Sequence, residues 1–376
     1  MPFISPDDSF ALWGALFVIV VLGLLAERHS KIGRRLTGAV IIILTGTAAS
    51  NLGVIPTAAP AYDVVWGQGV PIAVCLLLFD ADLRRIFRES GRVLIAFGIG
   101  AIGTVAGVFT GLAFVDLGPD SAALSGIFAA TYIGGSVNFA AVAEATGFRE
   151  SDALSAAVAA DNLAGTFLLA ALVALPSLKF IADRFVVASD AVREGGTDPA
   201  DAPQSVTPLS LAIALALAFT IVAVSKFGSA ALGLGTYSIL FTTVITLLLA
   251  TYARPLIAKA AGAFQLGMLT MFVFFVVIGA GADIGAMLAK GQTLFAFAAI
   301  LLAVHLVVVL VLGKIAKLEL SELMVGSNAC ILGAATAAAM AGTMGWRGLV
   351  TPGILAGTLG YAVANFVGLG LFSALQ

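Results

Sequence analysis

The chain has 376 residues, of which 60% are hydrophobic and only 11% are charged. Soluble domains carry about 25% charged residues, so this composition excludes an ordinary soluble protein. The formal net charge of −2 favours no class of macromolecular partner, and we expect no interaction with nucleic acid. The composition predicts an all-α, multi-pass protein whose surroundings are a lipid bilayer, and we expect it in the inner (plasma) membrane.

Two local features narrow this prediction. Cys75 and Cys330 both lie in apolar segments without CxxC spacing, which argues against a metal site or a disulfide framework. The first ten residues, MPFISPDDSF, have no positive charge before the first apolar run, so we expect no cleaved signal peptide.

Ten apolar runs approach the length of about 20 residues that crosses a bilayer. They occupy about 10–26, 36–54, 64–80, 93–116, 153–176, 207–226, 231–250, 265–281, 292–313 and 350–373. Two further stretches, at about 122–147 and 323–343, are rich in small and polar residues and predict broken or re-entrant helices. The hydrophilic segment 177–206 is mixed in charge, and we interpret it as a cytoplasmic linker between two halves.

The two halves, 1–176 and 207–376, resemble copies of each other. Sliding the chain by 198 residues places Gly147-Phe148-Arg149 on Gly345-Trp346-Arg347. At an offset of 200, the segment 94–97 (LIAF) falls on 294–297 (LFAF). Several matches in order at nearly one offset predict an internal duplication.

The positive charges favour an inverted pair of repeats, each with five spans and one hairpin. Lys and Arg prefer cytoplasmic loops, and with an odd number of crossings per half this arrangement places 16 of the 19 there. Only Arg149, Lys226 and Lys290 then lie outside. The first hairpin is expected to enter from outside and the second from inside. A broken helix that crosses the bilayer fully is the alternative.

The paired Gly-rich stretches are the candidate site for a solute. Unpaired backbone groups are costly in hydrocarbon, so a broken helix at membrane depth indicates a cavity or burial in protein. Half-helix ends at such breaks attract ions and anionic groups. The predicted substrate-binding residues are Gly134, Gly135, Ser136, Asn138, Ser327, Asn328, Gly333 and Thr336. Close helix packing through small residues is the alternative interpretation.

A carboxylate deep in a span is the candidate for ion coupling. Asp161 lies about eight residues into its apolar run, or roughly 12 Å at 1.5 Å per residue. Acids at that depth are costly and usually face a cavity or a partner. We predict ion coupling by Thr131, Asn138, Asp161 and Asn162, with Asp161 and Asn162 as candidate Na⁺ ligands. A hydrogen-bonded packing role for Asp161 is the alternative.

Other polar residues in or near the spans have simpler interpretations. Glu144 near the end of the first Gly-rich stretch is either a ligand or a solvated residue. Asp80, Asp82 and Asp283 lie at span ends, where helix capping and loop solvation explain them. His305, within LLAVHLVVVL, has no acidic neighbour in sequence and is interpreted as a packing residue whose hydrogen bonds are satisfied.

Several functional classes lack their sequence signatures. The chain has no GxxxxGK[ST] loop, so ATP hydrolysis is not supported. It has no TVGYG-like filter and no HExxH motif, which argues against a simple channel and a metalloprotease. We therefore expect no enzymatic activity and no cofactor apart from a coupling ion.

The segment TYIGGSVNFAAVAEATG, together with the 327–365 region that begins SNACILGAATAAAMAG, resembles an uncharacterised membrane-protein family of bacteria and plastids, domain of unknown function 819. The design is distantly similar to sodium/glutamate symporters, 2-hydroxycarboxylate carriers, bile-acid:sodium symporters and sodium/proton antiporters. That similarity implies two inverted five-span halves with Gly-rich re-entrant segments. The carriers have two adjacent glycines in each half. Gly134-Gly135 fits this pattern, whereas Leu332-Gly333 departs from it.

These observations predict an ion-coupled secondary transporter, driven by Na⁺ or H⁺, for a small organic solute. The solute is expected to be an organic anion, an amino acid or a small peptide. Alternating access would move the bundle with the hairpins against the other spans, within a homodimer. The alternatives are a cation/proton antiporter without an organic substrate and a non-transporting receptor or scaffold.

Overall fold

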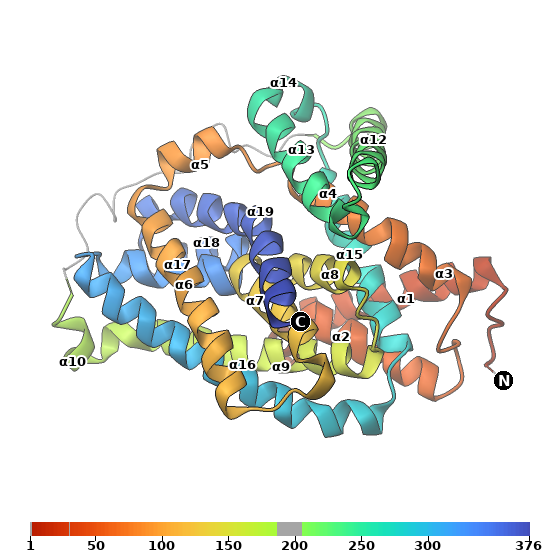
Figure 1. Cartoon of the computed structure of the whole chain (residues 1–376), viewed down its shortest axis with the longest axis horizontal. Helices are drawn as coiled ribbons and strands as arrows, with labels where there is room; N and C mark the ends of the chain where they lie inside the picture. The colour runs from red at the N-terminus through yellow and green to blue at the C-terminus, as the bar shows by residue number, and fades with distance from the viewer. Residues whose placement is uncertain (1, 30, 186–204) are drawn as a thin grey trace.

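A computed structural model describes residues 2–29, 31–185 and 205–376, with the side chains of 31–37 left out. The described chain is built from helices and their connections and contains no β-sheet (Figure 1). The predicted linker 177–206 falls mostly outside the described residues. Only its first part, with the short helix α10 (Lys179–Ala182), and its last two residues are described.

The first half contains five apolar helical segments and one broken stretch. In chain order these are α1 (Ser9–His29), α2 (Lys31–Asn51), the segment α3 (Pro60–Val64), η1 (Val65–Gly69) and α4 (Val70–Leu77), then α5 (Leu83–Glu89), α6 (Gly91–Phe114), α7 (Ser121–Gly134), α8 (Ser136–Thr146) and α9 (Ser151–Ala174). The segment η1 is a π-helix inside the third span. The short helix α5 carries the Arg cluster that follows this span.

The second half has a similar succession of five apolar segments and one broken stretch, but its short helix follows the second segment instead of the third. It contains α12 (Pro208–Ala231), α13 (Ser238–Tyr252), α14 (Arg254–Ile257), α15 (Ala263–Ala280), α16 (Ile284–Ile315), α17 (Leu320–Ile331), α18 (Ala334–Thr343) and α19 (Val350–Leu375). Nine helices of the described chain are long and apolar enough to cross a membrane, and a shorter apolar helix spans Gly38–Asn51. Together they match the ten predicted spans and confirm an all-helical membrane protein.

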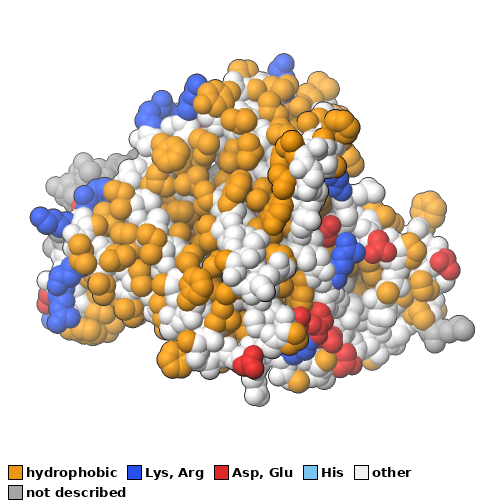
Figure 2. Space-filling model, viewed as in Figure 1, with side chains coloured by type: hydrophobic (Ala, Val, Ile, Leu, Met, Phe, Trp, Pro, Cys, Tyr) orange, Lys and Arg blue, Asp and Glu red, His pale blue; other side chains and the backbone are white. Residues whose placement is uncertain are grey.

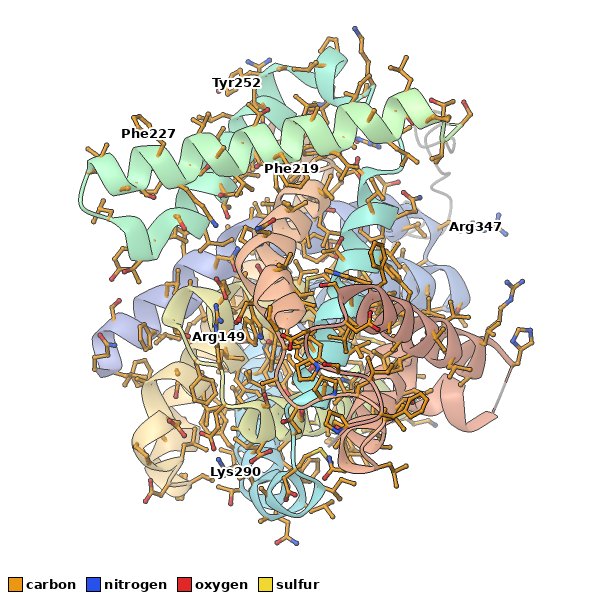
Figure 3. The ribbon with its side chains drawn as sticks, turned by 90° about the vertical axis from the view of Figure 1, so that its right-hand side faces the viewer. Arg149, Phe219, Phe227, Tyr252, Lys290 and Arg347 are labelled. Atoms are coloured by element: carbon orange, nitrogen blue, oxygen red, sulfur yellow. The ribbon has the colours of Figure 1, made fainter. Side chains whose placement is uncertain are left out.

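The helices α12, α13 and α14 stand out from the rest of the molecule, beside α4 and α15 (Figure 1). Figure 3 shows α12 lying across one side of the protein, with Phe219 and Phe227 on it. These rings are 53% and 79% exposed, and Tyr252 of α13 is 67% exposed. Large apolar side chains on the outside of a membrane protein are suited to contact with lipid chains.

The centre of the fold is a close crossing of α6 and α16. Gly103, Gly107 and Gly111 are four residues apart and lie on one face of α6, which lets the two backbones approach. A β-carbon at Gly107 would lie only 2.5 Å from the carbonyl oxygen of Leu301. These glycines also bring α6 close to the backbone of His305. A β-carbon at Gly103 would lie 3.1 Å from both the Cα and the carbonyl oxygen of His305.

Two capping aspartates and the ion pair between Arg92 and Glu322 stabilise the ends of the spans. Asp82 accepts hydrogen bonds from the first turn of α5, and Asp283 accepts one from Ala286 N of α16, which confirms the capping interpretation. Glu322 is buried at the start of α17 and pairs with Arg92 of α6, with Nε 2.8 Å from Oε1. This pair fixes the base of the second broken stretch to α6.

Charged side chains separate toward two ends of the molecule. In Figure 2 most of the visible Lys and Arg residues lie along the left and upper edge, near α5 and α14. The visible Asp and Glu residues lie mainly at the right and lower edge. The broad surface between these edges is mostly apolar, as expected for a region that faces lipid.

Candidate functional site

Both Gly-rich stretches are pairs of short helices separated by a sharp break, as predicted. The first break lies at Gly135, with φ 77° and ψ 179°, and the second at Gly333, with φ 91° and ψ −178°. This backbone region is essentially restricted to glycine. The two glycines are 198 residues apart, the offset that the sequence matches predict. Of the predicted glycine pair in the first half, Gly135 therefore makes the break and Gly134 ends α7.

The first stretch, residues 121–146, folds back on itself, and we call it hairpin 1. Both of its arms contact the C-terminal half of α19. A β-carbon at Gly368 would lie 2.7 Å from the carbonyl oxygen of Gly126 in α7 and 3.0 Å from Val142 in α8. The tip of the hairpin reaches the middle of α19, where a β-carbon at Gly360 would lie 2.4 Å from the carbonyl oxygen of Ile133.

The second stretch, residues 320–343, folds back in the same way, and we call it hairpin 2. Its arms contact the N-terminal half of α19. A β-carbon at Gly353 would lie 2.8 Å from Val325 in α17 and 3.4 Å from Ala337 in α18. Its tip also reaches the middle of α19, since a β-carbon at Gly357 would lie 2.5 Å from the backbone nitrogen of Ala334. The two hairpins thus run toward each other along α19.

Tyr361 of α19 lies between the two breaks. A β-carbon at Gly135 would be 3.7 Å from the Tyr361 ring, and one at Gly333 would be 3.6 Å from its hydroxyl oxygen. Tyr361 is half-buried. This residue was not predicted from the sequence. A solute held between the two breaks would contact this ring.

The broken end of α7 has its free carbonyl groups satisfied by side chains. A helix leaves its last four C=O groups without a helical partner. The carbonyl of Tyr132 accepts hydrogen bonds from Thr104 Oγ1 of α6 and Cys330 Sγ of α17, each at 3.2 Å. The carbonyl of Gly134 accepts one from Asn138 Nδ2 at 2.7 Å. Hairpin 1 is therefore tied both to itself and to hairpin 2.

His305 continues this network toward hairpin 2. Its Nε2 lies 2.8 Å from Ser327 Oγ, and its Nδ1 lies 3.1 Å from Thr104 Oγ1. Because the Thr104 hydroxyl donates to Tyr132, it accepts from His305, and we assign the proton of the neutral ring to Nδ1. Both ring nitrogens are satisfied, which agrees with the packing interpretation. The ring connects α16, α6 and α17 in the centre of the protein.

Several buried polar atoms near the breaks have no hydrogen-bonding partner among the described residues. They include Asn138 Oδ1, Asn328 Oδ1 and both side-chain atoms of Asn365, and all three side chains are fully buried. Unsatisfied buried polar groups are rare in proteins and often mark a place where a ligand or ion binds. Asn138 and Asn328 were predicted as site residues, whereas Asn365 was not.

Asp161 lies on α9 in the middle of the bundle. Asp161 is 9% exposed. Its carboxyl group lies near the hydroxyl of Tyr132, but the two groups do not have the geometry of a hydrogen bond. One turn further along α9, a β-carbon at Gly165 would lie 3.0 Å from Leu332 at the tip of hairpin 2. Asp161 is therefore buried beside the first break, on a helix that also contacts the second.

The other predicted residues take more local roles. Thr131 donates to the carbonyl of Ile127 in its own helix, at 2.8 Å. Thr336 donates to the carbonyl of Gly333, the N-cap of its own helix, at 2.9 Å, whereas Asn138 donates across the first break to the carbonyl of Gly134. Ser136 is exposed, and Asn162 is half-buried and donates to Val158 at 2.8 Å. These hydrogen bonds of Thr131, Asn162 and Thr336 are all local to their own chain segments.

Sequence reasoning missed four polar residues of this region. They are Thr104, Tyr132, Cys330 and Tyr361. One signal was present: Tyr132 and Cys330 are 198 residues apart, the same separation as the two break glycines. Nothing in the sequence marked Tyr361, because an isolated tyrosine in an apolar span is usually a packing residue.

The comparisons with known proteins agree with this architecture. The profile of the family described as "Protein of unknown function (DUF819)" matches residues 14–376. The chain is also 34% identical over 385 residues to "Uncharacterized membrane protein YjcL" of Bacillus subtilis (strain 168), covering 97% of this chain and 96% of that protein. Because the family profile matches nearly the whole chain, this multi-pass membrane protein belongs to the DUF819 family.

Proposed function

We propose that the protein is an ion-coupled secondary transporter for a small organic solute. The observation that carries this proposal is the pair of breaks at Gly135 and Gly333, which share one backbone conformation and meet at Tyr361. Broken helices that meet near the bilayer midplane, at the interface of two repeats, are a general feature of secondary transporters. The similar succession of elements in the two halves supports two inverted repeats, 1–176 and 207–376.

The solute would bind between the two hairpin tips. The helices α8 and α18 begin at the breaks, and neither has a side-chain hydrogen bond at its N-cap, so the positive ends of both helices would favour an anionic group of the solute. The unpartnered oxygens of Asn138 and Asn328 add acceptors for its polar hydrogens. The solute class is an organic anion, an amino acid or a small peptide.

The coupling ion would bind at Asp161. A buried carboxylate without a cationic partner is costly, and binding Na⁺ or H⁺ removes that cost. The Tyr132 hydroxyl, next to Asp161, links the occupancy of this site to hairpin 1. Asn162 and Thr131, whose polar groups bond within their own helices, would contribute only after a local rearrangement.

The distribution of charge supports an orientation in the bacterial inner (plasma) membrane. The Arg residues around α5 and those near α14 and α17 would face the cytoplasm, together with the linker. Hairpin 1 would then have its base outside and hairpin 2 its base inside. Alternating access would move the bundle of the two hairpins, α9 and α19 against the remaining spans, in an elevator-type motion within a homodimer. This proposal assigns no enzymatic activity and no cofactor beyond the ion.

Uptake by proteoliposomes under an imposed Na⁺ or H⁺ gradient tests the proposal. Solute accumulation should require the gradient and should fall strongly in Asp161→Asn and in Asn138→Ala. The matched control is Asp7→Asn, which removes an exposed carboxylate near the N-terminus. Undiminished uptake in both site variants would reject the site assignment, and the absence of gradient-driven uptake of any tested solute would reject the transporter.

A cation/proton antiporter is the second candidate. The burial of Asp161 beside Tyr132 favours it, because a single deep acid can exchange a proton for a cation without an organic solute. In this case a pH-sensitive dye inside proteoliposomes should report proton movement when Na⁺ or K⁺ is added alone. Proton movement that instead requires an organic solute would favour the symporter.

A further inference from the structure

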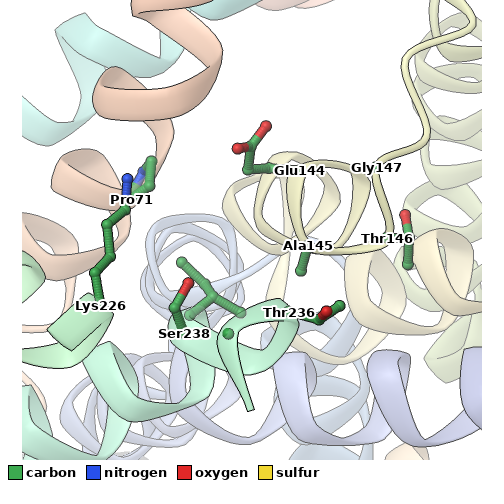
Figure 4. A pocket seen from close by; sticks show the side chains of 10 residues that line it. Pro71, Glu144, Ala145, Thr146, Gly147, Lys226, Thr236 and Ser238 are labelled. Atoms are coloured by element: carbon green, nitrogen blue, oxygen red, sulfur yellow. The ribbon is translucent and has the colours of Figure 1, made fainter. Parts of the chain in front are cut away.

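A cavity of about 340 Å³ lies between the end of α8, the second arm of hairpin 1, and the turn that joins α12 to α13 (Figure 4). Its volume is at the lower end of the roughly 300–1,000 Å³ that small-molecule pockets occupy. Two side chains of opposite charge, Glu144 and Lys226, line it together with Thr236, Ser238 and Thr146, whose hydroxyl donates to the Val142 carbonyl within α8. The cavity therefore offers a cationic group, an anionic group and neutral donors within one small volume.

The ammonium group of Lys226 is held at the cavity by a carbonyl group that a proline leaves unpaired in the third span. Pro71 lines the cavity and has no N–H group, so it cannot bond to the carbonyl of Gly67, four residues earlier. Lys226 Nζ donates to that carbonyl at 2.8 Å, which fixes the ammonium group and leaves two of its hydrogens for a ligand. Ser238, the first residue of α13, places the positive end of that helix on the same cavity.

The negative side of the cavity comes from hairpin 1. Glu144 projects from the last turns of α8, and one of its oxygens, Oε2, accepts a hydrogen bond from Arg149 at 3.3 Å. Arg149 is itself held by Asp63 at 3.3 Å and by the face of Trp66, 5.1 Å from its ring centre. The C-terminal end of α8 also lines the cavity, and its carbonyl dipoles add to the negative potential.

The location of these charges is unusual for the proposed orientation. Lys and Arg are disfavoured on the outer face, and only Arg149, Lys226 and Lys290 lie there. Two of these three residues belong to the cavity or to its Glu144. At each end of the cavity the side chain and the nearby helix end have the same sign of charge. Lys226 and the start of α13 are both positive, and Glu144 and the end of α8 are both negative.

We propose that this cavity binds a free amino acid as a zwitterion, with its ammonium group on Glu144 and its carboxylate on Lys226. The inference rests on the proposed transport function, for which it names the solute class and an outer capture site. A zwitterion would interact with the charged groups at both ends of the cavity, whereas a singly charged solute would interact with only one of them. The cavity lies between hairpin 1 and the α12–α13 pair, so bound solute would also sense the movement of hairpin 1.

Binding to the purified full chain in detergent tests the inference. The twenty standard amino acids are screened by thermal shift, and the strongest ligand is compared by calorimetry with its N-acetyl and amide derivatives. We expect an amino acid to raise the Tm and each derivative, which lacks one charge, to bind at least about tenfold more weakly. No shift with any amino acid, or equal binding of either derivative, overturns the inference.

Conservative variants identify the cavity as the binding site. Glu144→Gln keeps the side-chain size, and Lys226→Gln removes the charge from an exposed side chain and leaves it one bond shorter, so both variants are expected to fold. Each should weaken binding at least about tenfold, whereas the exposed control Lys259→Gln should leave it unchanged. Unchanged binding in both cavity variants overturns the inference.

The same measurements separate this inference from the proposed function. Binding needs no gradient, so charge-dependent binding without uptake in proteoliposomes would reject the transporter and keep the cavity site. Gradient-driven uptake of a solute with a single charge, unaffected by Glu144→Gln and Lys226→Gln, would reject the cavity site and keep the transporter.

Discussion

Gly135 and Gly333 adopt the same backbone conformation 198 residues apart, and both lie within contact distance of one tyrosine on α19. At each of them φ is strongly positive while ψ is close to 180°. Such backbone is found almost only at glycine, because a β-carbon would clash with the adjacent peptide groups. The two positions therefore act as matched turns that reverse the chain inside the helical bundle.

Substitution of either break glycine should destabilise the protein through the backbone alone. A β-carbon at Gly135 has ordinary contacts, with the Tyr361 ring 3.7 Å away, so crowding adds little. We expect Gly135→Ala and Gly333→Ala each to lower the free energy of unfolding by about 1–3 kcal/mol. Thermal unfolding in detergent measures the effect.

The matched control is Gly98→Ala in α6, where an added β-carbon meets no atom within 4 Å and the backbone is helical. This change should leave stability unchanged or raise it by up to about 1 kcal/mol. Equal melting temperatures for all three variants would contradict a strained turn at the breaks.

The close crossing of α6 and α16 should be sensitive to a single methyl group. A β-carbon at Gly107 would lie 2.5 Å from the Leu301 carbonyl oxygen, and backbone cannot rotate away as a side chain can. Gly107→Ala should therefore cost about 1–3 kcal/mol, which is typical of overpacking in a core. Comparison with Gly98→Ala in the same helix separates crowding from helix propensity, and similar stability of the two variants would argue against the close approach.

Loss of the His305 ring should leave the buried Ser327 hydroxyl without its partner. His305→Leu removes the hydrogen bonds to Ser327 and Thr104, but Thr104 still donates to the Tyr132 carbonyl, so the main cost is the stranded Ser327 hydroxyl, about 1–3 kcal/mol. The double variant His305→Leu/Ser327→Ala removes one stranded hydroxyl and should recover part of this loss. Chemical denaturation of the two single variants and the double variant gives the coupling energy. A coupling energy of zero would mean that the hydrogen bond contributes nothing to stability.

The Arg92–Glu322 pair should matter far more than the exposed arginines of α5. Arg92→Ala leaves Glu322, which is almost fully buried, without its cation. Breaking a buried pair costs about 3–5 kcal/mol, and we expect a value at or below this range because half of the Arg92 side chain is exposed. Loss of expression or of the folded peak in size-exclusion chromatography is the simplest measurement.

Arg88→Ala is the control for that pair, since the Arg88 side chain is 77% exposed and its ion pair with Glu89 is solvated. It should change stability by less than about 1 kcal/mol. The loss of stability caused by Glu322→Gln should lie between those of Arg92→Ala and Arg88→Ala. This variant breaks the ion pair but leaves no buried charge without a partner. A larger effect for Arg88→Ala than for Arg92→Ala would contradict this ranking.

The sequence by itself determined the helical membrane class, the ten spans and the two broken stretches. Hydrophobic runs are long and separated by charged loops, and a bilayer forces each run into a helix because every backbone group needs a partner. Glycine at 135 and 333 could be recognised because its conformational freedom is a local property. Capping by Asp82 and Asp283 was predictable for the same reason, since a helix start depends on only a few adjacent residues.

Only the tertiary structure decided which side chains meet. Thr104, Tyr132, His305 and Cys330 come from four helices, and their hydrogen bonds depend on how those helices cross. Tyr361 acquires its place between the breaks from the packing of α19 against both hairpins, which no local pattern encodes. The cavity of Glu144 and Lys226 joins the two halves of the chain in the same way. Local chemistry fixes the helices and their breaks, whereas side-chain partners far apart in sequence follow from helix packing.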